Sequence, residues 1–281
     1  MKFGQWDVES VMAGTFGLDG GAMFGVVPKA LWEKRLPPDE MNRIPMAMRL
    51  LLARGHGKTV LVDAGAGGGY GEKNDRIYAF KNHDNLFAAL EVAGGSPGEI
   101  TDVILTHLHF DHGAGVCEPD ENGDGWRLVL PQARHHVQKS QYEHAIHPNP
   151  RDRASYFHDR IEILEREDVL ELHDGPWSLA PGFEVLVFEG HTPGQQLPKI
   201  GAGGETAFYC GDLIPTQHHI PTPYIMSYDL DPVLAMDEKA PIVKQAYEEG
   251  WVLFFEHDAH VAACRVELEG DRFSAGETVE I

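Results

Sequence analysis

Several side chains that commonly bind metal ions lie close together in the stretch Thr106-His107-Leu108-His109-Phe110-Asp111-His112-Gly113. The preceding run, Val103-Ile104-Leu105, has the length and β-branched content typical of a buried strand. A loop that leaves the end of this strand can direct His107 and His109 to one point and Asp111 and His112 to another. Neutral imidazoles and a carboxylate are suitable ligands for Zn²⁺, Fe or Mn. The spacing therefore predicts a metal site on this loop.

Further residues with metal-binding side chains follow apolar, strand-like runs later in the chain. They are His191 in Gly190-His191-Thr192-Pro193-Gly194, Asp212 in Cys210-Gly211-Asp212, and His257 in Phe255-Glu256-His257-Asp258. In order and local context, these residues and the first stretch resemble the signature of the metallo-β-lactamase superfamily over about residues 46–260. The resemblance implies an α/β fold, the αββα metallo-β-lactamase-type sandwich, formed as one domain by residues 1–281.

The resemblance also implies a role for each residue. His107, His109 and His191 would bind a first metal ion, Asp111, His112 and His257 a second, and Asp212 would bridge the two. The implied cofactors are two divalent transition-metal ions, Zn first, with Mn or Fe as alternatives. Such a pair lowers the pKa of a shared water, and the bridging hydroxide would attack the carbonyl of a lactone or carboxylic ester. Asp111 and Asp212 are the candidate catalytic residues, because either can relay the proton.

The spacing of His191, Asp212 and His257 resembles that of the N-acyl homoserine lactonases and related small-ester hydrolases. Those lactonases carry a tyrosine three residues after the bridging aspartate, where it steadies the carbonyl oxygen, whereas this chain has Pro215. Tyr224, in the following segment, is a candidate to supply the hydroxyl instead. Gln195 stands where the family commonly has a histidine that is not a ligand. We therefore expect slower hydrolysis of homoserine lactones than in the dedicated enzymes, by about 10–10³-fold.

Other activities stay open as alternatives: hydrolysis of thioesters of the hydroxyacylglutathione type, hydrolysis of phosphotriesters, and mono-iron persulfide dioxygenase activity. The glutathione thioesterases use basic residues in an added C-terminal region, but the short segment after His257 contains only Arg265 and Arg272 as basic residues. A β-lactamase is disfavoured because the secreted enzymes have a signal peptide and often a cysteine at the position of Asp212. A binding protein without catalysis would be expected to have lost some of these ligands.

The composition narrows the range of partners. With 44 Asp and Glu against 23 Lys and Arg, the 281-residue chain carries a formal net charge of -21, which argues against binding to nucleic acid. No apolar stretch has the length of a signal-peptide core or a membrane span, and the 3 cysteines are widely spaced. We therefore expect a cytoplasmic protein that acts on a small-molecule substrate, with neither nucleic acid nor a membrane as partner. The oligomeric state stays open, with a homodimer as one alternative.

Strands and helices of an α/β fold are predicted around the candidate ligands. A hairpin at residues 47–62 ends at Asp63, a candidate acceptor for the N–H group of a ligand histidine. Helices are predicted at 85–93, 151–165 and 231–250, the last one broken or restarted at Pro241, with strands at 126–130 and 133–137. A glycine-rich hairpin turn is predicted at 201–204. Packing or surface roles are assigned to residues that match no metal-binding spacing, namely His135, His136, His144, His147 and Cys210.

Residues 1–45 show little periodicity. Their glycine-bearing segment 17–25 is open to two interpretations, a surface connection that folds back on the core or a lid over the substrate pocket. The lid interpretation predicts that Met23, Phe24 and Trp32 line the pocket, together with Ile220 and Met226 from later in the chain.

Overall fold

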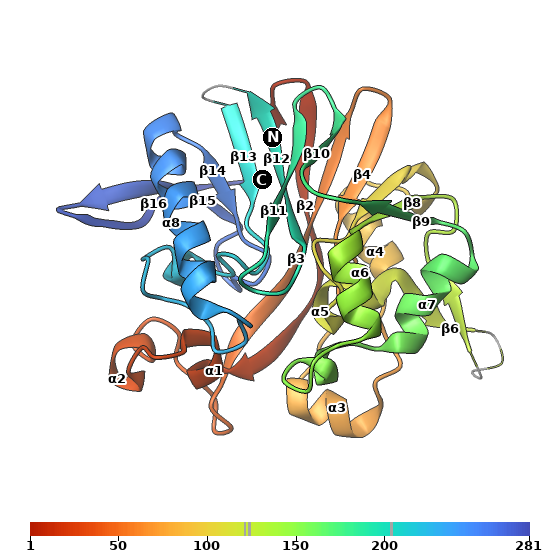
Figure 1. Cartoon of the computed structure of the whole chain (residues 1–281), viewed down its shortest axis with the longest axis horizontal. Helices are drawn as coiled ribbons and strands as arrows, with labels where there is room; N and C mark the ends of the chain where they lie inside the picture. The colour runs from red at the N-terminus through yellow and green to blue at the C-terminus, as the bar shows by residue number, and fades with distance from the viewer. Residues whose placement is uncertain (121, 123–124, 203–204) are drawn as a thin grey trace.

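Two seven-stranded sheets packed face to face dominate the computed structural model, which describes residues 1–120, 122, 125–202 and 205–281 (Figure 1). The first sheet has the order β1 (Lys2–Phe3), β2 (Trp6–Asp19), β3 (Arg43–Gly55), β4 (Lys58–Val62), β5 (Asp102–Ile104), β8 (Arg134–Gln138) and β9 (Leu170–His173). The second has the order β10 (Trp177–Ala180), β11 (Phe183–Phe188), β12 (Gln195–Ala202), β13 (Glu205–Tyr209), β14 (Val252–Phe254), β15 (Ala263–Glu269) and β16 (Arg272–Val279). A small sheet pairs β6 (Cys117–Pro119) with β7 (Trp126–Leu128). Part of the predicted turn at 201–204 lies outside the described residues.

Apolar side chains from both sheets fill the space between them. Trp6, Val62 and Ile104 of the first sheet belong to one buried cluster with Phe183 and Val252 of the second. Helices cover the outer faces: α4 (Leu86–Val92), α6 (Lys139–Ile146) and α7 (His158–Arg166) lie on the first sheet, and α8 (Pro232–Glu249) lies on the second (Figure 1). This order of helix, sheet, sheet and helix confirms the predicted αββα sandwich.

The N-terminal segment contains a long strand that the sequence pattern did not indicate. Strand β2 pairs with β3 along most of its length, but the register shifts between Met12 and Thr15. Because a bulge interrupts the two-residue alternation of buried and exposed side chains, the strand leaves no regular pattern in the sequence. Two short helices follow, α1 (Gly20–Phe24) and α2 (Lys29–Trp32).

Two predicted helices have different limits in the structure. The helix expected at 151–165 begins only at His158, because Tyr156 has an extended backbone. This conformation places the Tyr156 hydroxyl 3.0 Å from Thr192 Oγ1. Helix α8 continues through Pro241 without the expected break. The hairpin predicted at 47–62 and the helix predicted at 85–93 correspond to β3–β4 and α4.

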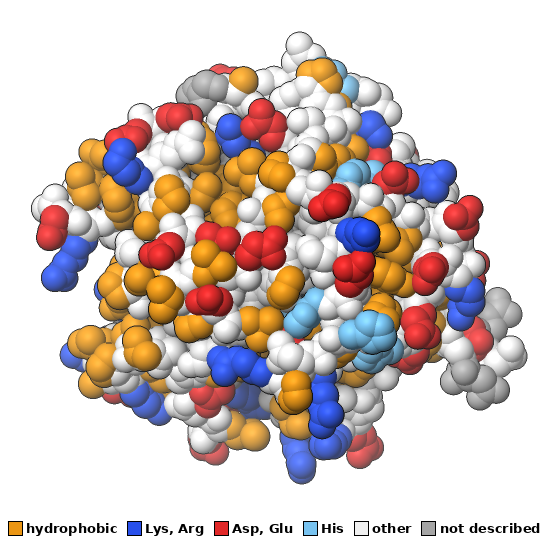
Figure 2. Space-filling view, viewed as in Figure 1, with side chains coloured by type: hydrophobic (Ala, Val, Ile, Leu, Met, Phe, Trp, Pro, Cys, Tyr) orange, Lys and Arg blue, Asp and Glu red, His pale blue; other side chains and the backbone are white. Residues whose placement is uncertain are grey.

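Acidic and basic side chains are interspersed over the face of the molecule shown in Figure 2. Apolar side chains lie between them, without a continuous basic area on this face (Figure 2). Among the described residues, no helix has both the length and the apolar character needed to cross a membrane.

Candidate metal centre

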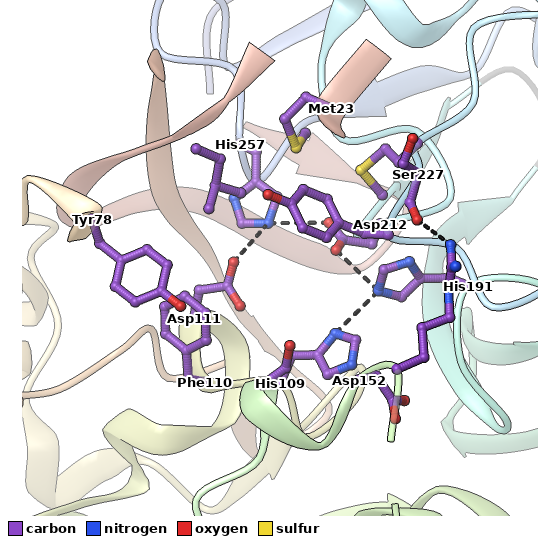
Figure 3. Close-up of a pocket in the computed structure, with 15 residues that line it drawn as sticks. Met23, Tyr78, His109, Phe110, Asp111, Asp152, His191, Asp212, Ser227 and His257 are labelled. Atoms are coloured by element: carbon purple, nitrogen blue, oxygen red, sulfur yellow. Dashed lines mark hydrogen bonds and ion pairs between the residues drawn. The ribbon is translucent and has the colours of Figure 1, made fainter. Parts of the chain in front are cut away.

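The candidate ligands come from loops at the ends of strands in both sheets. The loop after β5 carries His107 and His109, and the short helix α5 (Phe110–Gly113) that follows carries Asp111 and His112. The remaining three, His191, Asp212 and His257, follow β11, β13 and β14. All of them are buried, and the labelled ones point toward a common centre in Figure 3. The fold therefore brings together every ligand expected from the sequence.

The ligand atoms form two adjacent groups, within each of which they lie no more than 4.8 Å apart. One consists of His107, His109, His191 and Asp212, and the other of Asp111, His112 and His257. In the first group, His109 Nδ1 lies 2.9 Å from His107 Nε2 and 3.2 Å from His191 Nε2. In the second, His112 Nε2 lies 3.0 Å from His257 Nε2. Several imidazole nitrogens that converge on one point fit a transition-metal ion.

Asp212 connects the two groups. Its Oδ2 lies 3.1 Å from His191 Nε2, and its Oδ1 lies 3.1 Å from His257 Nε2. Oδ1 is buried and has no hydrogen-bond partner among the described residues. A buried carboxylate oxygen without a partner is costly, whereas a cation in each group would engage both oxygens. The donor set therefore fits a carboxylate that bridges two metal ions.

Hydrogen bonds on the outer side of the rings fix the histidine tautomers. His191 Nδ1 lies 2.8 Å from Asp229 Oδ1, and His257 Nδ1 lies 2.8 Å from the Ala47 carbonyl oxygen. Because these oxygens accept hydrogen bonds, Nδ1 of each ring carries a proton, which leaves Nε2 as the nitrogen that can bind a metal ion. This is the arrangement that a metal-binding histidine needs. Asp229 was not predicted from the sequence, since it lies 38 positions from His191.

His112 has two carboxylates behind it. Glu256 Oε2 lies 2.8 Å from His112 Nδ1, and Asp63 Oδ2 lies 3.2 Å from the same atom. Asp63 also accepts hydrogen bonds from the Thr106 backbone N–H at 2.7 Å and hydroxyl at 2.8 Å. The predicted acceptor Asp63 is therefore in place, but Glu256 is closer. The sequence analysis missed Glu256, whose one signal is its position directly before His257.

Close backbone packing holds the His191 and Asp212 loops. A Cβ atom at Gly190 would lie 2.3 Å from the backbone nitrogen of Ala235 in α8, so this position requires glycine. Gly211 has a φ of 43°, which side chains rarely permit. The Gln195 side-chain oxygen accepts a hydrogen bond of 3.0 Å from the Asp212 backbone N–H. The residue that replaces the family's histidine thus holds the backbone of Asp212.

The charges in the centre act strongly on one another. Burial alone would lower the pKa of His191 and His257, but the Asp212 carboxylate outweighs this effect and raises the pKa of each to about 9. Burial and neighbouring imidazoles lower the pKa of His107 and His109 well below the usual value. A cation that enters the centre therefore has to displace protons from His191 and His257.

A cavity of about 480 Å³ opens onto this centre. Its floor is formed by the candidate ligands His109, Asp111, His191, Asp212 and His257. Four apolar side chains line the cavity, Leu18, Met23, Phe110 and Met226, together with the two tyrosines Tyr78 and Tyr228. The remaining lining residues are polar or charged, namely Arg151, Asp152, Ser155 and Ser227. Met23 and Tyr78 lie beside the ligands in Figure 3.

The lid interpretation is only partly correct. Met23 and Met226 line the cavity as expected. Phe24 does not, because its ring stacks on Trp32 and on His219, with centroid distances of 5.5 Å and 4.7 Å. The short helix α1 thus directs Met23 toward the cavity and Phe24 into the core.

Three other sequence-based assignments have clear outcomes. Ile220 is fully buried in the core against α8 and does not line the cavity. Tyr224 is also absent from the lining and packs edge-on against Phe24 at 6.2 Å. The four histidines given packing or surface roles belong to none of the metal-ligand groups of the described residues; for example, His136 pairs with Asp102 at 2.9 Å.

The fold and the donor set have a counterpart in a known family. A family model described as the metallo-beta-lactamase superfamily matches residues 50–257, which include all the candidate ligands. The chain belongs to the metallo-β-lactamase superfamily. It is therefore a metal-binding hydrolase, as the sequence motifs indicated.

Relatives within the superfamily include lactonases. An N-acyl homoserine lactonase of Bacillus thuringiensis is 25% identical over 187 residues, which cover 65% of this chain and 66% of the relative. A probable metallo-hydrolase of Mycobacterium tuberculosis is 27% identical over 218 residues, which cover 68% of this chain and 66% of the relative. The match thus spans just under two thirds of the length of each relative.

Solved structures of the superfamily match the whole chain. A probable metal-dependent hydrolase from Staphylococcus aureus superposes with a TM-score of 0.89 at 28% identity, covering 100% of this chain and 99% of that one. The dizinc quorum-quenching lactonase AidC, solved with a product, superposes with a TM-score of 0.80 at 23% identity, covering 100% and 97%. The similarity to AidC, at 23% identity, shows a shared fold and nothing about the substrate of this chain.

Proposed function

We propose that this metallo-β-lactamase superfamily member hydrolyses a lactone or a carboxylic ester, with two divalent metal ions, Zn first, held by the ligands described above. The observation that carries this proposal is the position of Asp212, which directs one oxygen to each ligand group at the floor of a cavity. Two ions held there would lower the pKa of a water molecule and polarise a carbonyl oxygen. Relatives named N-acyl homoserine lactonase support the choice of substrate class.

Asp111 and Asp212 are positioned to handle the proton. Both carboxylates line the cavity, and Asp111 Oδ2 lies 3.7 Å from His257 Nε2. Hydrolysis of an ester adds the water oxygen to the acyl carbon and a proton to the leaving oxygen. A carboxylate at the cavity floor can hold the proton from the water and deliver it to that oxygen.

Pro215 occupies the position where the lactonases carry a tyrosine, and we propose that Tyr228 supplies the missing hydroxyl. It lines the cavity, and burial together with the charges of Asp19, Asp111 and Asp212 raises the pKa of its phenol. The hydroxyl therefore stays protonated at neutral pH, and we assign it the hydrogen bond to a developing oxyanion. Tyr78 also lines the cavity, and burial and the Asp111 carboxylate raise the pKa of its phenol.

The walls of the cavity favour esters and lactones over glutathione thioesters. Leu18, Met23 and Met226 offer apolar contacts for an acyl chain. The C-terminal residues form β15 and β16 of the second sheet and contribute no residue to the cavity lining. The basic groups that would bind the carboxylates of a glutathione conjugate are therefore not supplied by this region.

Kinetics on a substrate panel, with metal analysis of the same sample, test this proposal. We expect higher kcat/KM for lactones or simple esters than for glutathione thioesters and phosphotriesters, with roughly two ions per chain. Asp212→Ala should lower metal content and hydrolysis together, because both groups lose a ligand oxygen. A preference for the glutathione thioester would overturn the substrate class, and one ion per chain at full activity would overturn the dinuclear centre.

A further inference from the structure

Arg151 is the one Lys or Arg side chain among the described residues that line the cavity. It lies between α6 and α7, in the segment that also contributes Asp152 and Ser155 to the lining. The chain as a whole has a net charge of -21, and Arg151 belongs to none of the groups of candidate metal ligands.

Backbone carbonyls hold the guanidinium in place. Arg151 Nη2 donates hydrogen bonds to the carbonyl oxygens of Ser227 and of Asp229, the latter at 3.3 Å. Asp229 also accepts from His191 Nδ1, so the guanidinium is fixed relative to the metal centre. A guanidinium has five N–H groups. Those on Nε and Nη1 find no acceptor among the described residues and stay available to a ligand.

The neighbouring carboxylate does not neutralise this cation. Asp152 is 6% exposed, and its Oδ2 lies 2.7 Å from His144 Nε2. Arg151 itself makes no ion pair with any residue that the structure describes. Its backbone is fixed by a hydrogen bond of 2.7 Å from its N–H to Asn149 Oδ1. A charged group that is already held in position loses little entropy when it binds a ligand.

We propose that Arg151 binds a carboxylate in the acyl part of the substrate, so that the preferred esters or lactones carry one anionic group beyond the scissile carbonyl. This inference rests on the proposed function and narrows its substrate class. Both two-pronged edges of the guanidinium include Nη2, which the carbonyls already engage, so a carboxylate would accept one charge-assisted hydrogen bond from Nε–H or from Nη1–H. One guanidinium accommodates one carboxylate, whereas a glutathione conjugate carries two. Because Arg151 is exposed, solvent limits the gain to about tenfold in kcat/KM.

A set of matched para-nitrophenyl esters tests the inference on the metal-loaded enzyme. The monoester of adipate carries a terminal carboxylate, its carboxamide analogue has the same shape without the charge, and the valerate ester has neither group. For the wild type, we expect kcat/KM to be about tenfold higher for the adipate ester than for the carboxamide. Arg151→Met should abolish this ratio while hydrolysis of the valerate ester persists. Arg151→Lys should retain part of it, because the charge remains but the planar group that the two carbonyls hold in position does not.

Arg153→Met is the matched control, since Arg153 is exposed two positions away and does not line the cavity. Its substrate ratio should equal that of the wild type. If Arg151→Met fails to fold, added salt still tests the wild type, because screening should reduce the preference for the charged ester. An unchanged ratio in Arg151→Met, or no preference in the wild type, overturns the inference. Loss of activity on all esters and lactones in the wild type would instead refute the proposed function.

Discussion

At His112, two carboxylates share one ring nitrogen. Burial raises the pKa of Glu256 to about 8, and the Asp63 carboxylate adds to this effect. Burial alone would lower the pKa of His112, but Glu256 and Asp212 raise it well above its usual value. Glu256 keeps the ring oriented with Nε2 toward the second ligand group.

Glu256→Gln should weaken metal binding by about 10–100-fold, because an amide is a poorer partner than a carboxyl group for the Nδ1 side of the His112 ring. Competition with a chromophoric chelator measures the affinity directly and does not depend on catalysis. Glu248→Gln is the control, since that carboxylate is 53% exposed in α8. Equal affinities of Glu256→Gln and wild type would show that Asp63 alone orients the ring.

Tyr228→Phe should lower kcat on lactones by about 10–10³-fold with a smaller change in KM, because the phenol acts on the developing oxyanion. Tyr224→Phe is the matched control and should leave the kinetics unchanged, since Tyr224 faces Phe24 rather than the cavity. Steady-state kinetics of both variants and the wild type on one lactone measures these changes in kcat and KM. Similar losses in both variants would contradict the assignment of the oxyanion donor.

At the scale of elements, helix α8 is connected to the cavity wall through hydrogen bonds of Lys239. Lys239 is buried and donates hydrogen bonds to the carbonyl oxygens of His219, Pro221 and Tyr224, at 2.9, 3.2 and 2.7 Å. His219 Nε2 in turn lies 2.9 Å from the Met23 carbonyl oxygen. A continuous set of contacts thus connects α8 to a residue of the cavity wall. The segment around Met23 and Phe24 is therefore packed against the core.

Phe24→Ala should lower the free energy of unfolding by about 3–5 kcal/mol, because it leaves a cavity beside Trp32 and His219. Its effect on substrate selection should be equal for short and long acyl chains. Met23→Ala should act in the opposite way, reducing kcat/KM more for long chains than for short ones. Chemical denaturation and kinetics on an ester series separate the two variants. A chain-length effect confined to Phe24→Ala would restore the lid interpretation.

At the scale of the whole molecule, the candidate centre links the two sheets, since the first sheet supplies His107, His109, Asp111 and His112 and the second supplies His191, Asp212 and His257. Removal of metal by a chelator should therefore lower Tm. At a free metal concentration of 100 Kd, one site contributes about 2.7 kcal/mol of stability. Differential scanning calorimetry measures the shift, and re-added Zn should reverse it. An unchanged Tm would mean that the ligands hold together without metal.

The amino-acid sequence by itself was sufficient to predict the candidate ligands and the class of fold. The dense stretch from His107 to His112 indicated a metal site, and the resemblance to the metallo-β-lactamase superfamily extended the prediction to His191, Asp212 and His257. Helix α4 and the β3–β4 hairpin were also predicted, because helix caps and the alternation of side chains along a strand are patterns that extend over only a few residues.

Only the tertiary structure decided which residues surround those ligands. Glu256 and His112 are 144 positions apart and Arg151 and Asp229 are 78 apart, so their contacts depend on how the two sheets pack. Phe24 and Met23 are neighbours of similar polarity, yet the turn of α1 buries one in the core and directs the other to the cavity. Strand β2 was not predicted because its bulge interrupts the alternation of buried and exposed side chains that marks a strand in a sequence. In each case the missing information is the direction of a side chain in space, which residue type and spacing do not contain.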